Sequence, residues 1–397
     1  MVPTWDVIVL GSGPAGSTAA ALLADAGHHV LLLEREQMPR FHIGESLLPA
    51  SLPVLARLGI EPDPSIYVFK RGATFVDEQA GRSSTFDFDD ALPGPPRHAW
   101  QVDRAGFDKQ LSDRAMSAGA ARRFGVTVTK VDLGEDEVVV HMREGEERAR
   151  FFVDASGQNR LMARQLQSAT PLPMFGRTAA FIHYDGLSDA TMDEIGPGGE
   201  IRVLVMDDGW SWLIPLANRR LSVGVVSRND EPATSRLEPF IASSPMLQRW
   251  TRGTTRSEMR RERNFSFRNR QSAGRRFVCV GDASCFLDPV LSSGVSFALV
   301  GAAHAADVLG PALASGREGD PDLMADHESF MDQGYLMFAT LVDRWYNTQF
   351  VENFFFARDY QEQTLREIVS LLAGDVWRSD NRFAQGLRQG RRRFTWD

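Results

Sequence analysis

The chain has 397 residues, with 44 Lys and Arg against 52 Asp and Glu, which gives a net charge of −8. Its length suggests about two or three domains, and its hydrophobic and charged fractions of 43% and 24% are those of an ordinary globular protein with a sizeable core. The two cysteines, Cys279 and Cys285, exclude a disulfide scaffold and a cysteine-rich metal site, and we expect no metal. Cys285 is expected to be an inert core residue. The overall acidity argues against nucleic-acid binding.

No targeting or membrane-spanning segment is expected. The first residues lack the basic stretch of a signal peptide, and their apolar run leads directly into a glycine motif. The most apolar later stretch, residues 295–314, contains His304 and Asp307, which predicts that it is too polar to span a membrane. We therefore expect a cytoplasmic protein.

The first elements in chain order predict a nucleotide-binding unit. An apolar strand at residues 6–10 leads into Gly11, Gly13 and Gly16, a helix follows over residues 17–25, and a second strand at 30–33 ends in Glu34. Gly11 permits the tight turn, Gly13 lets the backbone approach a pyrophosphate, and Gly16 lets helix and strand pack closely. The helix N-terminus then faces the phosphates, and Glu34 is the candidate acceptor for a ribose hydroxyl.

The remaining elements predict two further units. Residues 72–101 and 176–227 alternate apolar and polar residues, as antiparallel strands do, with turns at 93–96 and 196–199. A helix is expected over 103–119. A second nucleotide-type segment, 277–282, precedes a helix at about 294–313, and the pattern is helical from Asp322, with aromatic residues Phe330, Tyr335, Phe338, Trp345, Phe350 and Phe354 at near-helical spacings.

These elements predict an α/β fold in which a Rossmann-type nucleotide-binding domain is interleaved with a mixed or antiparallel sheet domain. The predicted boundaries are 1–71, 102–175 and 268–320 for the nucleotide-binding domain, 72–101 and 176–267 for the sheet domain, and 321–397 for a C-terminal helical lobe. The distant Gly281-Asp282 pair favours a long cofactor, although composition alone leaves FAD and NAD both open.

Three motifs carry a resemblance to flavin-dependent halogenases, within the flavoprotein fold shared with aromatic hydroxylases and geranylgeranyl reductases. Residues 41–49 (FHIGESLLP) resemble the family's GES segment, although His42 stands where Lys is common. Residues 210–215 (WSWLIP) match the W-x-W-x-I-P signature, and residues 69–75 (FKRGATF) resemble the segment with the active-site lysine. The hydroxylase Asp-Gly motif is absent in its usual form, because residues 154–157 read DASG.

The resemblance implies that Lys70 receives hypohalous acid, which reduced FAD, oxygen and chloride or bromide generate, and delivers halogen to an electron-rich ring. A lone lysine is ordinarily a surface residue. Only three of the 44 basic residues are lysines, however, namely Lys70, Lys109 and Lys130, which favours a specific role for Lys70. A compact ammonium whose pKa falls on burial suits this role, whereas a guanidinium stays charged.

The resemblance also implies the remaining site residues. Arg104, at the start of the 103–119 helix, resembles the family's flavin-contacting arginine, and Asp282 suits the ribityl chain. The expected FAD-binding residues are Gly11, Gly13, Pro14, Ala15, Gly16, Glu34, Arg35, Arg40, Ile43, Glu45, Ser46, Arg104, Asp282, Pro289, Gly294 and Val295. The expected halide-binding residues are Ser292, Ser293 and Gly294, which can equally serve the flavin alone. The expected wall between flavin and lysine is Trp210, Trp212, Ile214 and Pro215, for which plain core packing is the alternative.

The residue at position 291 implies the substrate class and a carrier-protein partner. Tryptophan halogenases have Glu where this chain has Leu291, and Leu-Ser-Ser-Gly resembles the phenol and pyrrole branch, whose substrates are often tethered to an acyl or peptidyl carrier protein. A separate flavin reductase is expected to supply reduced FAD. Residues 249–276 hold ten arginines against two glutamates, which suits docking of an acidic carrier, or else is a solvated, exposed strand pair. The tail at 391–393 is expected to be flexible.

Two other functions stay open at this point. The fold equally serves hydroxylases, dehydrogenases and prenyl reductases, because a fold does not fix a reaction. A non-catalytic flavin-binding protein is the second alternative. The halide, the regiochemistry and the oligomeric state are not predicted.

Overall fold

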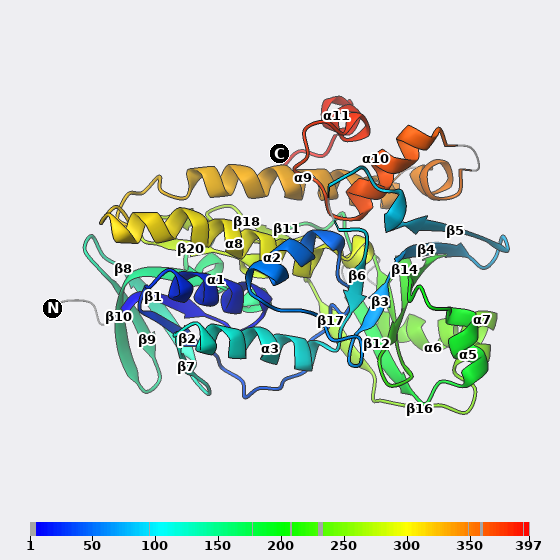
Figure 1. The fold of residues 1–397 in the computed structure, drawn as a ribbon, viewed down its shortest axis with the longest axis horizontal. Coiled ribbons are helices and arrows are strands. Elements are labelled where there is room, and N and C mark those ends of the chain that lie inside the picture. Colours follow the sequence, from blue (N-terminus) through cyan, green and yellow to red (C-terminus); the bar gives the residue numbers. More distant parts are fainter. Residues whose placement is uncertain are drawn as a thin grey trace.

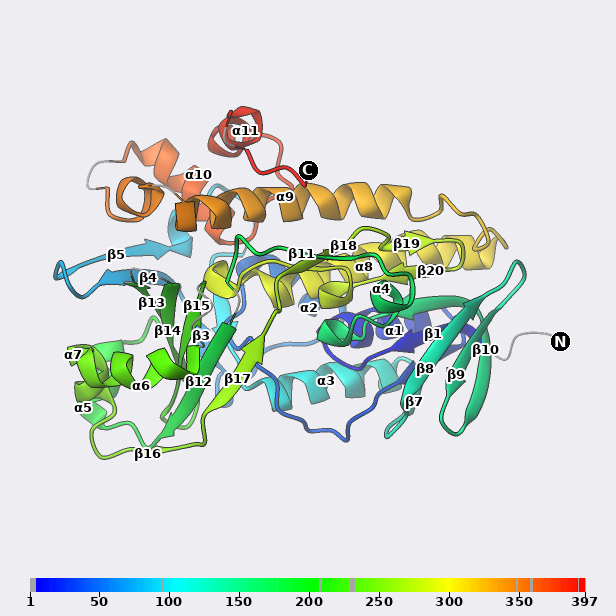
Figure 2. The same cartoon turned by 180° about the vertical axis from the view of Figure 1, so that it is seen from behind.

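The structure is a computed structural model that describes residues 5–94, 96–176, 178–206, 209–228, 233–347, 349–357, 360–391 and 393–396. Pro95 of the turn at 93–96 and Arg392 of the basic tail lie outside the described residues. Figures 1 and 2 show an elongated molecule with one sheet at each end and long helices running between and above them.

The predicted nucleotide-binding unit forms a sheet with a parallel centre. The strand order is β19-β20-β10-β1-β2-β7, and a hairpin of β8 and β9 extends it from β10. The apolar run Val7–Leu10 pairs in parallel with Val30–Leu33 on one side and with Phe151–Asp154 on the other. These strands are β1 (Trp5–Leu10), β2 (Val30–Leu33), β7 (Ala121–Arg123), β8 (Val128–Leu133), β9 (Val138–Met142), β10 (Gly145–Asp154), β19 (Ala273–Gly274) and β20 (Phe277–Cys279).

Helices cover this sheet because their apolar faces match its buried strands. Helix α1 (Pro14–Asp25) is almost entirely buried and packs against both α3 (Arg104–Ser117) and α8 (Ser293–Ala314). Asp103 caps α3 by accepting a hydrogen bond from the Gly106 amide at 3.1 Å. Of the two short helices in this part of the fold, α2 (Leu52–Arg57) contacts α8, and α4 (Leu161–Gln165) contacts β8.

The second large sheet has the order β16-β12-β15-β14-β13-β4-β5, with β17 also pairing with β12. All of its strand pairs are antiparallel except β13 with β4. Its strands are β4 (Gly72–Asp77), β5 (Arg82–Asp87), β12 (Thr178–Asp185), β13 (Ile201–Met206), β14 (Gly209–Leu216), β15 (Arg220–Ser227), β16 (Thr255–Arg256) and β17 (Arg260–Arg263). The predicted mixed or antiparallel sheet is therefore confirmed.

Two small sheets join the halves of the molecule. One is β11 (Ala169–Pro171) with β18 (Phe267–Asn269) and β21 (Cys285–Phe286), and the other is β3 (Val68–Lys70) with β6 (Ala99–Gln101). The β3–β6 pair crosses the predicted boundaries at 71/72 and 101/102, and the division into three units stays a prediction.

The C-terminal part is helical, as the aromatic spacing predicted. Its elements are α9 (Ala325–Asn347), the π-helical turn η6 (Val351–Phe355), α10 (Glu362–Leu372) and α11 (Arg382–Gln389). Phe297 of α8 packs against Tyr335 and Phe338 of α9, with ring centroids 4.8 and 5.3 Å apart. Figure 1 shows α9 running along α8 towards the β4–β5 edge of the second sheet.

Helix α8 differs from its prediction in one respect. By length and composition it is apolar enough to cross a membrane, despite His304 and Asp307. However, 67% of its most apolar stretch is buried inside the protein, and it packs between α1 and α9, which is the position of a core helix.

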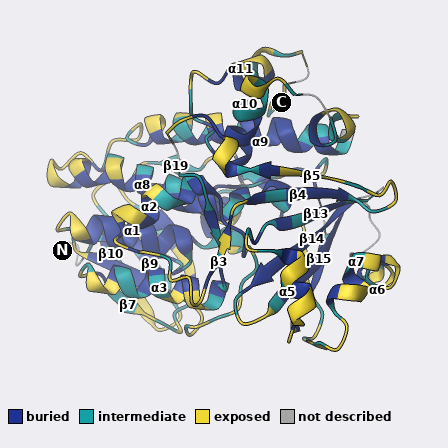
Figure 3. Cartoon of the chain, turned by 45° about the vertical axis from the view of Figure 1, so that its right-hand side comes forward, coloured by how far each residue is buried: buried dark blue, intermediate teal, exposed yellow. Residues whose placement is uncertain are grey.

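Residues 186–263 contain three helices that were not predicted and two short strands whose pairing was not predicted. Three helices that the strand alternation did not predict, α5 (Asp189–Ile195), α6 (Ala233–Ser243) and α7 (Pro245–Trp250), cover one face of the second sheet, with their outer sides exposed in Figure 3. Strands β16 and β17 are both exposed, as the alternative interpretation of this arginine-rich segment expected, and each pairs with β12.

Candidate active site

The glycine turn before α1 leaves open space where a phosphate is expected. Gly11 has a φ of +103°, and a side chain there would collide with the carbonyl of Ala155. A Cβ on Gly16 would collide with the Gly11 carbonyl, whereas a Cβ on Gly13 would meet only the Arg40 guanidinium, at 3.3 Å. Gly11 and Gly16 are thus required by packing within the protein, and Gly13 by access from outside.

Glu34 lies at the end of β2 beside this turn, as predicted. Its carboxylate accepts hydrogen bonds from the backbone amides of Ser12, at 2.8 Å, and Glu36, at 2.9 Å. A carboxylate has about four acceptor positions, so capacity remains for a ribose hydroxyl. The neighbouring Arg35 is mostly exposed and pairs with Glu36.

Arg104 and Arg40 converge on the fully buried Asp108. Arg104 forms a bidentate ion pair with this carboxylate, with N–O distances of 2.8 and 3.1 Å, and Arg40 approaches it to 3.3 Å. Arg104 also donates to the carbonyl of Ile43, at 2.5 Å, and to that of Gly44. Arg104 therefore anchors the GES segment to α3.

The GES segment carries buried polar atoms whose partners are missing from the described residues. Glu45 Oε1 lies 2.6 Å from Nε2 of His183 on β12, and both side chains are buried. Glu45 Oε2, Ser46 Oγ and Gln101 Oε1 have no hydrogen-bond partner in the part of the chain that the structure describes. Such atoms cost free energy unless a ligand or water completes them, so this segment could accept hydrogen bonds from a bound group.

Lys70, on β3, is buried on the inner side of the β3–β6 pair. Its side chain is 1% exposed, and Nζ donates a hydrogen bond of 2.7 Å to the carbonyl of Leu47 in the GES segment. Desolvation lowers the pKa of Lys70 to about 7. Alternation along β3 leaves Phe69 40% exposed on the opposite side, where it stacks on His98.

The predicted wall residues form the buried strand β14. Trp210 and Trp212 have ring centroids 5.7 Å apart, and Ile214 and Pro215 are buried after them. The indole of Trp212 donates to Ser222 of β15 at 3.1 Å. Strand β14 also contacts β6, which lies between Lys70 and the GES segment in the strand pairing.

Residues 289–294 contain the predicted halide-binding residues, are named here the halide turn, and lead from β21 into the start of α8. Ser292 has a left-handed backbone, with φ of 57°, and caps α8, while Ser293 and Val295 are buried. The first amides of a long helix lack partners within the helix and favour anions. Ser292 and Gly294 are partly accessible at this helix start.

Asp282 follows β20, and Nε2 of Gln158 donates to it at 3.2 Å. Desolvation raises the pKa of Asp282 to about 6. Sequence analysis missed Gln158 and His183, because neither lies in a recognised motif. No signal in the sequence singled out His183, because it pairs with Glu45 only through the packing of β12 against the GES segment.

Comparisons with known proteins decide the family. The family model for tryptophan halogenases matches residues 6–94 and 89–389, which is nearly the whole chain. The chain belongs to the tryptophan halogenase family. A relative from Pseudomonas fluorescens, the 1H-pyrrole-2-carbonyl-[peptidyl-carrier protein] chlorinase, is 29% identical and covers 94% of this chain and 90% of its own.

Solved halogenase structures share the fold. A flavin-dependent brominase, solved as a triple mutant, superposes with a TM-score of 0.83 at 27% identity, covering 97% of this chain and 98% of the brominase. The myxobacterial chondrochloren halogenase, described as a variant of FAD-dependent halogenases, gives 0.75 at 30% identity, covering 96% and 92%. The protein is thus an enzyme, a flavin-dependent halogenase with an FAD-binding fold of the predicted class.

The chain's own residues fit FAD. The open side of Gly13 and the α1 N-terminus suit the pyrophosphate, with the Arg40 guanidinium beside them. Of the unpartnered atoms, those of Glu45 and Ser46 lie in the GES segment, which the family resemblance expects near the flavin, and that of Gln101 lies in the neighbouring β6.

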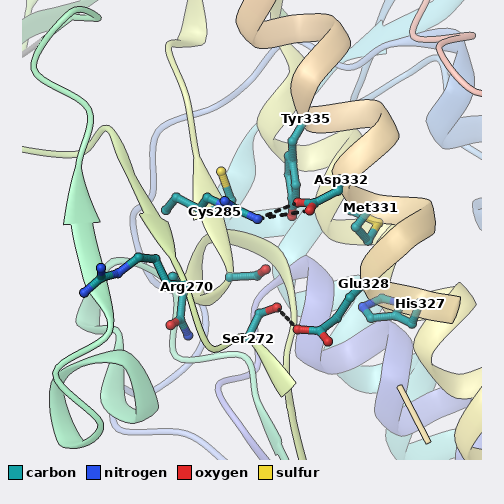
Figure 4. Close-up of a pocket in the computed structure, with 11 residues that line it drawn as sticks. Arg270, Ser272, Cys285, His327, Glu328, Met331, Asp332 and Tyr335 are labelled. Carbon is teal, nitrogen blue, oxygen red and sulfur yellow. Dashed lines mark hydrogen bonds and ion pairs between the residues drawn. The ribbon is translucent and has the colours of Figure 1, made fainter. Parts of the chain in front are cut away.

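A separate cavity of about 250 Å³ lies between α9 and the β18–β21 sheet of this halogenase (Figure 4). Interactions beside it join α9 to this region: Arg268 of β18 pairs with Asp332 at 3.0 Å, and Ser272, in the loop after β18, donates to Glu328 at 2.7 Å. Cys285 lines the cavity, and burial raises the pKa of its thiol well above the usual value, which disfavours the reactive thiolate.

Proposed function

We propose that this halogenase transfers chlorine or bromine to an electron-rich phenolic or pyrrolic ring, and that Lys70 carries the reactive halogen to it. The observation that carries the proposal is the burial of Lys70 beside the GES segment, with its pKa lowered to about 7. At neutral pH a large fraction of this amine is unprotonated, whereas an exposed lysine is almost entirely charged.

Bound reduced FAD supplies, with oxygen, the oxidising power that converts a halide to hypohalous acid. The residues proposed to hold FAD are those predicted from the sequence, with Glu34 on the ribose and Asp282 on the ribityl chain. We propose that the halide binds at Ser292, Ser293 and Gly294, where unpaired amides at the start of α8 favour an anion. Chloride or bromide, oxygen and a separate flavin reductase complete the requirements.

Lys70 is proposed to act in one of two ways. As a donor, Nζ holds hypohalous acid by a hydrogen bond. As a nucleophile, the neutral amine attacks the halogen, so that an N–halogen bond forms, the O–halogen bond breaks, and water leaves. The ring then takes the halogen and loses a proton, which regenerates the amine. The buried walls of β14 separate this chemistry from solvent.

The tethered substrate is proposed to arrive on an acidic carrier protein. The name of the Pseudomonas relative states a peptidyl carrier protein for that enzyme, and the present chain offers an exposed cationic strand, β17. Arg260, Arg261 and Arg263 of β17 form what we call the arginine edge. The Arg260 guanidinium lies 3.6 Å from the ring centre of Phe41, so this edge adjoins the GES segment.

Other arginines of residues 249–276 contribute less to this surface. Arg256 forms an ion pair with Glu238, and Arg249 with Glu194. Arg276 is buried beside Glu318. The docking surface is therefore smaller than the net charge of the segment suggests. Because both cysteines are unpaired and buried, a reducing compartment such as the cytoplasm suits the protein.

Mass spectrometry tests the proposal. The FAD-loaded enzyme, a flavin reductase, NADH and bromide are incubated with phenolic and pyrrolic substrates, both free and carrier-bound. We expect the bromine isotope pattern in the product, and its loss when bromide is omitted. A hydroxylated product formed without any halide dependence would contradict the proposal.

A further inference from the structure

The carboxylate that immediately precedes the halide turn, Asp288, is buried and accepts four hydrogen bonds. Its Oδ1 accepts from Nε1 of Trp210, at 3.1 Å, and from the amide of Val290, at 3.0 Å. Its Oδ2 accepts from the amide of Gly176 and from the hydroxyl of Tyr346, both at 2.8 Å. The side chain is 2% exposed.

These four donors come from four different parts of the chain. Trp210 belongs to the wall strand β14, Val290 to the halide turn, Gly176 to the segment that enters β12, and Tyr346 to the last turn of α9. Asp288 is therefore the point at which the halide turn is attached both to the second sheet and to the C-terminal helices.

The donors around Asp288 suit an ionised carboxylate, although desolvation raises the pKa of this carboxyl above its usual value. The indole and the two backbone amides can only donate, so an acid proton or an amide group on Asp288 would leave donors facing one another. A Cβ on Gly176 would collide with Asp288 Oδ2 and would lie 2.6 Å from Val226, so the backbone approaches closely enough only because residue 176 is glycine. No Lys or Arg within the described ranges forms an ion pair with Asp288, and the four hydrogen bonds stabilise its charge.

We propose that Asp288 is a positioning residue that fixes the halide turn against Trp210 and Tyr346 and thereby sets the affinity of the enzyme for halide. This inference rests on the proposed halide site at Ser292–Gly294. Asp288 itself lies before that site and acts through the backbone, because its Oδ1 fixes the Val290 amide at the start of the turn.

The test compares three substitutions in the FAD-loaded enzyme. Asp288→Asn removes the charge, Trp210→Phe removes one donor to Oδ1, and Tyr346→Phe removes one donor to Oδ2. The KM for chloride is measured at constant ionic strength, with saturating reduced FAD and substrate. Tyr184→Phe, a second buried tyrosine on β12 that does not contact Asp288, is the matched control.

A positioning role and simple charge repulsion predict opposite changes in the chloride KM of Asp288→Asn. If Asp288 positions the turn, the chloride KM rises about tenfold or more for Asp288→Asn, as expected for breaking a hydrogen bond to a charged group, and rises by a smaller factor for Trp210→Phe and Tyr346→Phe. The kcat at saturating chloride changes much less in Asp288→Asn and Tyr346→Phe. If the buried charge merely repels the anion, the KM falls in Asp288→Asn, and this result would overturn the proposal.

A second readout does not require FAD or turnover. Hydrogen exchange of the amides at residues 289–295 is measured in the flavin-free proteins. We expect faster exchange than in the wild type in all three variants, and an unchanged exchange rate in Tyr184→Phe. If Asp288→Asn does not fold, Trp210→Phe and Tyr346→Phe decide the matter. An unchanged chloride KM in both would overturn the proposal.

One further variant separates this inference from the proposed halide site. Gly294→Val places a branched side chain at the start of α8, where its Cβ would lie 3.1 Å from the ring of Phe286. If it leaves the chloride KM unchanged, the halide site itself is wrong. If it raises the KM while the Asp288, Trp210 and Tyr346 variants do not, only the positioning role is wrong.

Discussion

Lys70 gives the most direct test at the scale of single residues. Because the halide step takes place at the flavin, we expect Lys70→Ala and Lys70→Arg to consume reduced flavin and oxygen at near wild-type rates. Halogenated product should fall by roughly two or more orders of magnitude, as for removal of a positioned donor. Arg is the sharper variant, because it keeps the charge but not the deprotonatable amine. Normal product formation in both variants would exclude Lys70 from the reaction.

The lowered pKa of Lys70 predicts a pH profile. With a pKa of about 7, the neutral fraction of the amine rises about tenfold between pH 6 and pH 8. If the neutral amine accepts the halogen, product formed per flavin oxidised rises over this interval, whereas a donor role predicts a fall. The profile is measured in the wild type with Lys70→Ala as the control, and a flat profile would exclude both roles.

The lowered pKa of Lys70 also makes the stability of the folded protein depend on pH. The pKa of Lys70 is lower in the folded protein than its usual 10.5, so the unfolded chain binds more protons between about pH 7 and 10.5. Burial of Lys70 therefore costs stability below pH 7, and this cost decreases as the pH rises above 7. Lys70→Met is expected to raise the unfolding temperature at pH 6 more than at pH 9, as measured by calorimetry.

The glycine turn offers a matched pair of substitutions. A side chain on Gly13 meets only the end of Arg40, so Gly13→Val should fold but lose FAD, because it blocks the approach of the pyrophosphate. A Cβ on Gly16 collides with backbone, so Gly16→Ala should lower stability by roughly 1–3 kcal/mol even without FAD. Flavin absorbance and thermal unfolding measure the two effects. Stoichiometric FAD in folded Gly13→Val would refute this placement of the pyrophosphate.

At the scale of elements, strand β17 provides the prediction for a partner. Charge reversal at Arg260 and Arg261 should raise the KM for a carrier-bound substrate and leave flavin oxidation intact, and the wild-type rate should fall as salt rises. Arg219→Glu, on another exposed turn, is the control. The alternative role of the arginines is to prevent edge-to-edge pairing of an exposed strand. That role predicts aggregation of the variant and equal activity on free and carrier-bound substrates.

The elements that sequence analysis missed are short and polar. Helix α5 interrupts a region of alternating strands, and its signals were a Ser188 cap and an acidic first turn at Asp189. Helix α7 begins with the pair Ser244-Pro245, which is also a typical helix start. Both helices gain stability by packing on the second sheet, and their own sequences show too little periodicity to reveal this.

At the scale of the whole molecule, the source of electrons separates this enzyme from hydroxylases of the same fold. We expect the purified protein to oxidise NADH or NADPH only negligibly, and to form product when a separate flavin reductase is added. The measurement is NADPH consumption with and without substrate. Rapid consumption by the pure protein, stimulated by the aromatic substrate, would favour a hydroxylase.

The local elements of this protein follow from short stretches of its sequence. The glycine spacing of residues 11–16 favours a tight turn, and the apolar strands on either side are typical of a buried parallel sheet. The W-x-W-x-I-P and GES motifs, and a lysine in an arginine-rich chain, pointed to the residues that now lie near one another. These are properties of short segments, which local sterics and hydrophobic burial control.

Contacts between groups far apart in the chain depend on how the elements pack in three dimensions. Lys70 and Leu47 are 23 positions apart in the chain, and Glu45 and His183 are 138 positions apart. The four donors around Asp288 likewise come from separate parts of the chain. No local pattern encodes such distances, because they depend on how two sheets and a helical layer pack. The pKa of Lys70 follows in the same way: the sequence supplied the amine, and burial by the assembled fold lowered its pKa.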